Sequence, residues 1–161
     1  MKTGTGAQVV YFSHGGGPLP ILGDPGHAAM VAFMQSLPAR LHKPQAVLVI
    51  SAHWEEQVAT LLSAPNPPLF YDYYGFPAEA YNISYPVSGS PDLARRISTL
   101  LDKASIPTRL DDQRGFDHGV FIPLKIMYPT ADIPCVQLSL LRGLDPSAHL
   151  DLGKALRPLL E

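Results

Sequence analysis

The sequence predicts an α/β fold in which helices flank a mostly parallel central sheet. Two apolar, β-rich runs, residues 9–14 and 46–53, each end at a histidine, and an amphipathic segment at residues 27–41 separates them. Strand, helix and strand in this order form a βαβ unit, whose crossover is almost always right-handed. A further apolar run at residues 133–141 predicts another buried strand.

The first run ends at His14 and is followed by three glycines and a proline. Glycine removes side-chain bulk and allows positive φ, so the backbone of residues 15–17 can approach a ligand or metal closely. The helix expected next is disturbed near its end by Pro38. The second strand ends at His53. If the two strands are parallel neighbours, their histidines meet at the carboxyl edge of the sheet, where open α/β sheets bind ligands.

The rest of the chain alternates short elements with turns rich in proline and glycine. Strands are expected at residues 58–63 and 108–110, the latter at an edge, and helices at residues 92–104, at 118–127 and from residue 145 onward. The stretch at residues 70–77 is rich in aromatic side chains. We expect it to cap the core, with the lining of a pocket for a flat substrate as the alternative.

Composition restricts the function classes. The 161 residues are enough for one domain with a real core, and 46% hydrophobic and 16% charged residues are typical of a globular protein. A net charge of −2 without a basic cluster argues against nucleic acid as a partner. The single cysteine, Cys135, lies in an apolar strand and is expected to be buried and inert. No signal peptide or membrane span is recognised, so we expect a cytoplasmic protein without a membrane partner.

Three of the six histidines lie next to small residues at predicted element boundaries: His14, His53 and His118. Their equivalent settings indicate a shared site, and imidazole ligands suit Fe(II) or Zn(II). Of the other three, His27 and His42 are expected to be solvated or to cap helix ends, and His149 is expected to be exposed. Glu55 and Glu56 follow His53 closely and are either acceptors behind the metal ligands or part of an exposed turn.

Four motifs occur in order along the chain: SHGGGP at residues 13–18, SAHW at 51–54, YDYYGFP at 71–77 and FDHG at 116–119. Taken together they resemble class III extradiol ring-cleavage dioxygenases of the LigB superfamily, and within it the DOPA 4,5-dioxygenase type. The resemblance covers nearly the whole chain. It implies a LigB-like three-layer sandwich with a mostly parallel central sheet.

The resemblance also implies an enzyme that opens the ring of a DOPA-like catechol with O2 at a non-haem metal. That metal is usually Fe(II) and sometimes found as Zn(II). It would be bound by His14 and His53 and by a third ligand near the C-terminus of the family, and His118 matches a family histidine that acts as acid/base. The candidate substrate-binding residues are Gly16, Gly17, Tyr74 and Asp117.

Members of this family are longer, and the third metal ligand is expected beyond residue 161. We therefore expect residues 1–161 to form a single α/β domain that corresponds to the N-terminal portion of such an enzyme. Apolar surface left open by a missing portion would favour a homo-oligomer. Two alternatives stay open: a LigB-like binding module without metal chemistry, and a zinc-dependent hydrolase that uses Glu55 as its base.

Overall fold

The structure is a computed structural model that describes residues 7–160. Its longer elements, in chain order, are α1 (Ala28–Ser36), β1 (Val47–Glu56), β2 (Ala59–Leu62), α2 (Pro91–Lys103), β3 (Thr108–Asp111), α3 (His118–Met127), β4 (Cys135–Leu141) and α4 (Pro146–Ala155). Short 3-10 helices occupy Pro25–His27, Leu37–Ala39, Ala78–Asn82 and Arg157–Leu160. Within residues 7–160, no helix has both the length and the apolar character needed to cross a membrane.

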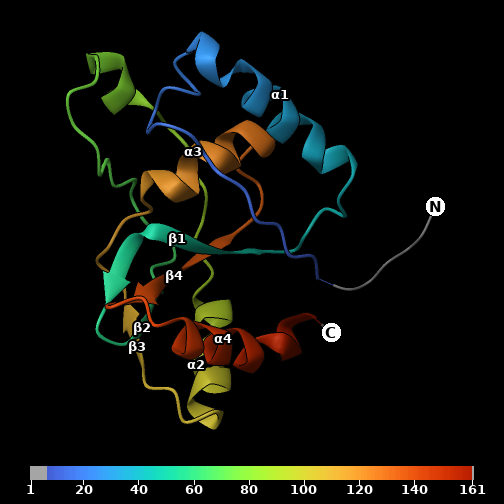
Figure 1. The fold of residues 1–161 in the computed structure, drawn as a ribbon, viewed down its shortest axis with the longest axis vertical. Coiled ribbons are helices and arrows are strands. Elements are labelled where there is room, and N and C mark those ends of the chain that lie inside the picture. Colours follow the sequence, from blue (N-terminus) through green and yellow to red (C-terminus); the bar gives the residue numbers. More distant parts are fainter. Residues whose placement is uncertain (1–6, 161) are drawn as a thin grey trace.

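The four strands form one sheet in the order β1-β4-β2-β3. β1 pairs with β4 and β2 with β3 in parallel, whereas β2 and β4 pair antiparallel. Figure 1 shows α1 and α3 on one side of the sheet and α2 and α4 on the other. The predicted three-layer, mostly parallel α/β architecture is therefore confirmed, with β3 at an edge as expected.

Alternation along the strands divides the core between the two faces of the sheet, because successive side chains on a strand point to opposite sides. Cys135 packs with the aromatic residues of the α3 layer. The next residue, Val136, packs with Leu138 and with Ile97 of α2 in the opposite layer. Cys135 is buried as expected, and burial raises the pKa of its thiol to about 12.

The aromatic stretch at residues 70–77 caps the core, as predicted. The ring of Tyr73 is buried and belongs to the same cluster as Phe121 of α3. Its hydroxyl donates to the carbonyl of Ala80 at 2.6 Å, and the hydroxyl of Tyr71 donates to that of Ile83 at 2.6 Å. These bonds satisfy the polar ends of largely buried rings, which lets the segment close one end of the core.

The predicted strand at residues 9–14 is wrong. The segment has no regular secondary structure, and the side chains of Val9 and Tyr11 are 83% and 100% exposed. A β-rich run becomes a strand only where it gains a pairing partner and a covering layer. Here Phe12 instead packs against the cluster between α1 and α3. The first strand of the predicted βαβ unit is therefore missing, and β1 lies at the edge of the described sheet opposite β3.

Candidate functional site

The imidazoles of His14, His53 and His118 meet although they come from three separate parts of the chain. His14 lies in the segment before α1, His53 on β1 and His118 at the first position of α3. Their ring centroids are 5.0, 5.0 and 4.0 Å apart, and one potential ligand atom from each lies within 4.8 Å of the other two. The three histidines singled out from the sequence therefore form one cluster.

An irregularity in β1 presents His53. The register of β1 against β4 shifts between Ile50 and Glu55, and such bulges redirect side chains at sheet edges. The backbone N–H of His53 donates to Oγ of buried Ser51 at 3.2 Å. The prediction that the strand ends at His53 is wrong, because β1 continues to Glu56 beyond this bulge.

A carboxylate missed by the sequence reasoning orients His118. Oδ1 of Asp72 accepts the backbone N–H of His118 at 2.9 Å and the ring Nδ1–H at 2.8 Å. Because an ionised carboxylate only accepts, Nδ1 carries a proton, and in the neutral ring Nε2 is then the acceptor. Burial alone would raise the pKa of Asp72, but the hydrogen bonds from His118 lower it. The sequence feature that could have pointed to Asp72 is its position as the one acidic residue in the aromatic stretch at residues 70–77.

Asp117 is fully buried and joins three elements beneath the histidines. Its side chain accepts the N–H of Gly119 at 3.0 Å, which caps α3, and the hydroxyl of Ser51 at 2.8 Å. It also accepts from Arg114 at 3.2 Å and from Gln137 of β4. These four donors match the roughly four lone-pair positions of a carboxylate. Asp117 thus faces protein groups on all sides.

The glycine loop carries His14 through two residues with positive φ, Gly15 at +80° and Gly17 at +56°. The N–H of Gly16 donates to Nε2 of His27 at 3.1 Å. The expectation that His27 is solvated or caps the helix is therefore wrong: the helix N-cap shows no side-chain bond from it, and its ring is bound to the loop.

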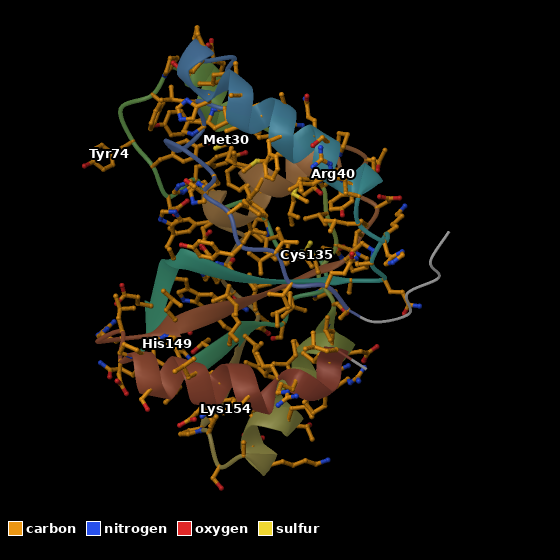
Figure 2. The ribbon with its side chains drawn as sticks, turned by 45° about the vertical axis from the view of Figure 1, so that its right-hand side comes forward. Met30, Arg40, Tyr74, Cys135, His149 and Lys154 are labelled. Carbon is orange, nitrogen blue, oxygen red and sulfur yellow. The ribbon has the colours of Figure 1, made fainter. Side chains whose placement is uncertain are left out.

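The remaining candidates lie around the cluster. The ring of Tyr74 is 91% exposed and points into solvent (Figure 2). Glu55 is exposed and does not belong to the cluster. His149 is partly buried rather than exposed, since Nε2 accepts the N–H of Leu141 at 3.0 Å and Nδ1 faces the carbonyl of Asp145 at 2.7 Å. Those contacts tie α4 to the end of β4.

The electrostatics of the cluster favour neutral rings at His14 and His53. Burial, and then the nearby imidazole of His118, lower the pKa of both His14 and His53. The neutral ring is the form that binds a metal ion. The Nε2 atoms of His14 and His53 face each other at 2.9 Å, and two ring nitrogens at this distance need a proton or a cation between them. The donor set therefore fits a metal such as zinc or iron.

Comparison with known proteins gives consistent results. The family model described as the catalytic LigB subunit of aromatic ring-opening dioxygenase matches residues 28–161. "Dioxygenase tasH" of Hapsidospora irregularis is 44% identical over 95% of this chain and 50% of its own length. "4,5-DOPA dioxygenase extradiol" of Escherichia coli K12 is 38% identical over 99% of this chain and 57% of its own.

A solved structure resembles the fold as well. The crystal structure of an uncharacterized protein from Escherichia coli K12 superposes with a TM-score of 0.65 at 37% sequence identity. The match covers 81% of this chain and 48% of that one. The chain thus spans about half the length of the curated relatives it matches.

Proposed function

The chain belongs to the LigB family of catalytic subunits of aromatic ring-opening dioxygenases, and on this premise we propose that it serves the extradiol opening of a DOPA-like catechol by O2 at a non-haem metal. The observation that carries the proposal is the convergence of His14, His53 and His118 within 4.8 Å. The names of several relatives, 4,5-DOPA dioxygenase extradiol, support the catechol as substrate class.

We assign His14 and His53 as metal ligands, because both rings have a lowered pKa and direct Nε2 toward the same point. Fe(II) is the proposed native metal, with Zn(II) as a substitute in isolated protein. When bound, the metal would supply the redox chemistry that joins the catechol and O2. The protein residues supply ligation, orientation and proton transfer.

We assign His118 as the acid/base. Asp72 holds the proton on Nδ1, so Nε2 faces the cluster as a free acceptor that can take a proton from a catechol hydroxyl and later return it. The ring is buried and its edge packs on Tyr73, with the centroids 5.7 Å apart. This packing limits the access of water to the transferred proton and fixes the ring plane.

We propose two kinds of role for the remaining candidates. The backbone of Gly16 and Gly17 beside His14 would contact the substrate, and Tyr74, whose ring is 91% exposed, would contact it only if its ring turned inward. Asp117 is better explained as a positioning residue, because its carboxylate is occupied by four protein donors. We further propose that the chain forms a single domain, since the two larger core clusters pack on opposite faces of one sheet.

Anaerobic loading of the protein with Fe(II), followed by L-DOPA and O2, tests the proposal. We expect a yellow ring-opened product and matching consumption of O2 from protein that includes the third metal ligand, and weak metal binding with little turnover from the 161-residue chain alone. His14→Gln and His53→Gln should abolish both signals, whereas His42→Gln, which changes an exposed histidine, should leave them intact. Product formation that survives loss of both His14 and His53 would overturn the assignment.

The alternatives predict other outcomes. Absence of both bound metal and ring-opened product would favour a binding module without metal chemistry. A hydrolase needs a carboxylate base beside the cluster. Asp72 is hydrogen-bonded to His118, and Glu55 lies outside the cluster. Hydrolysis that is lost in Glu55→Gln, with no ring opening, would support that reading instead.

A further inference from the structure

His14 is not held in place by a helix or a strand, so contacts of the glycine loop must fix its position. His53 and His118 are carried by β1 and α3, whereas the described residues before the glycine loop form neither helix nor strand. The turn bonds of the loop are local, such as Leu19 N–H to Gly16 O at 3.2 Å. Apart from the contact between the Nε2 atoms of His14 and His53 within the cluster, the described hydrogen bond that ties residues 13–16 to the chain outside the loop is the one from Gly16 N–H to His27.

His27 fits the loop closely. Its ring stands at the start of α1, and a Cβ atom placed on Gly15 would lie 2.4 Å from Cδ2 and 2.8 Å from Nε2 of that ring. Such distances are far below van der Waals contact, so the loop backbone lies directly against the imidazole. Only glycine at position 15 allows this approach, and its φ of +80° further favours glycine.

The ring of His27 is itself fixed. Nδ1 lies 2.6 Å from Oδ2 of Asp24, and because the carboxylate only accepts, Nδ1 carries the proton. Nε2 is then the acceptor that the N–H of Gly16 requires. Asp24, His27 and Gly16 thus form a chain of hydrogen bonds in which the acid selects the tautomer that can hold the loop.

We propose that His27, oriented by Asp24, is a positioning residue that sets the place of the His14 imidazole in the cluster. The role of His27 in catalysis rests on the proposed function. The hydrogen bonds that hold the loop are independent of it. The two residues act through the backbone of Gly15 and Gly16. Asp24 is the N-cap residue and His27 the last residue of the 3-10 helix before α1, and neither belongs to the three-histidine cluster.

Metal affinity gives the first test. Zn(II) binding to the 161-residue protein is measured by competition with a chromophoric chelator for the wild type, His27→Ala, His27→Gln and His42→Ala. We expect His27→Ala to weaken binding by about 10- to 100-fold, the range typical of residues behind metal ligands. His27→Gln should restore most of the affinity, because its amide oxygen can accept the N–H of Gly16 near the position of Nε2. Wild-type affinity in His27→Ala would overturn the proposal.

The matched control is His42→Ala, which removes an exposed histidine just after the 3-10 turn that follows α1. Its affinity should equal that of the wild type. Thermal unfolding of all four proteins shows whether each variant is folded. If His27→Ala unfolds, Asp24→Asn tests the same chain of bonds by weakening the acceptor that selects the tautomer, and unchanged affinity in that variant would count against the proposal.

A second test needs no metal. In 15N-labelled protein, a through-bond coupling between the Gly16 amide nitrogen and Nε2 of His27 reports the hydrogen bond directly. We expect this coupling in the wild type, and we expect the ring resonances of His14 to shift in His27→Ala but not in His42→Ala. If the wild type binds no Zn(II), the proposed function fails while this readout still decides the positioning role. Unchanged His14 resonances in His27→Ala would refute it.

Discussion

Asp72 and Asp117 both bind the first turn of α3, but they serve different histidines. Asp72 accepts from the ring and the backbone of His118. Asp117 accepts from Ser51, whose hydroxyl in turn accepts the N–H of His53. One carboxylate therefore sets the tautomer of the proposed acid/base, and the other sets the backbone of a proposed metal ligand.

Asp72→Asn should lower the rate of ring opening by about 10- to 100-fold, the effect typical of groups that orient site histidines. The amide oxygen is a weaker acceptor than the carboxylate and holds the Nδ1–H tautomer of His118 less firmly. Turnover of L-DOPA by Fe(II)-loaded protein measures the effect. Asp112→Asn, in an exposed turn, is the control and should match the wild type. Equal rates for the two variants would contradict the orienting role.

Asp117→Ala should destabilise the protein by about 3 kcal/mol or more, because it leaves several buried donors without an acceptor and the Arg114 guanidinium without its partner. Urea denaturation measures the change in the free energy of unfolding. The exposed Asp112→Ala should change it by less than about 0.5 kcal/mol. A loss as small for Asp117 as for Asp112 would show that the four bonds contribute little.

At the scale of elements, the site depends on the close approach of α3 to β1. A Cβ atom on Gly119 would lie 2.5 Å from Oγ of Ser51 and 2.9 Å from Cδ2 of His53. The helix can approach the strand only because this position lacks a side chain. The glycine of the FDHG motif thus brings His118 to His53, a role that its sequence position alone does not reveal.

Gly119→Ala should therefore destabilise the fold by about 1–3 kcal/mol, as expected for overpacking of a tight contact, and should also weaken Zn(II) binding. Gly153→Ala in α4 is the matched control, since a Cβ atom there meets nothing within 4 Å. That change should stabilise the protein by about 0.5–1 kcal/mol through helix propensity. Thermal denaturation compares the two, and a neutral Gly119→Ala would contradict the contact argument.

The sequence predicts most elements because their patterns are local. The apolar spacing of α2 and the run of β4 decide their own structure, and both are found near the expected bounds. Residues 9–14 have an equally good strand pattern, but pairing is a property of the neighbours, and no strand within residues 7–160 pairs with them. The antiparallel pairing of β2 and β4 likewise depends on long-range packing that no single segment encodes.

The site was predictable to a similar degree. His14, His53 and His118 stand out because each lies beside small residues at an element boundary, and they do converge. Asp72 and His27 do not stand out, because their roles arise from contacts 46 and 11 residues away along the chain. Hydrogen-bond partners at such separations follow from the tertiary fold.

At the scale of the whole molecule, stability should fall at acidic pH. Burial and then the neighbouring imidazole of His118 lower the pKa of His14 and His53, so below a pH of about 6.5 the unfolded chain binds more protons than the folded one. This contribution is complete above pH 6.5 and is lost as the pH falls through the lowered pKa values.

Urea denaturation of the metal-free protein at pH 7.5 and 5.5 measures the effect. The double variant His14→Gln and His53→Gln removes both groups and should show a smaller loss of unfolding free energy between the two pH values. His42→Gln is the control, because its side chain is exposed, and should keep the wild-type difference. If the double variant loses as much unfolding free energy between pH 7.5 and 5.5 as the wild type, the lowered pKa values of His14 and His53 are contradicted.

The three histidines also differ in how firmly the chain holds them. His53 lies on β1 of the sheet and His118 on α3, which packs against the sheet. His14 lies in a segment without described strand pairing, in which Val9 and Tyr11 are exposed. Local opening of such a segment needs far less free energy than global unfolding. The dissociation rate of a bound metal ion would then be set by local opening of the segment that carries His14. Amide hydrogen exchange in this segment should be faster than in β4 and α3.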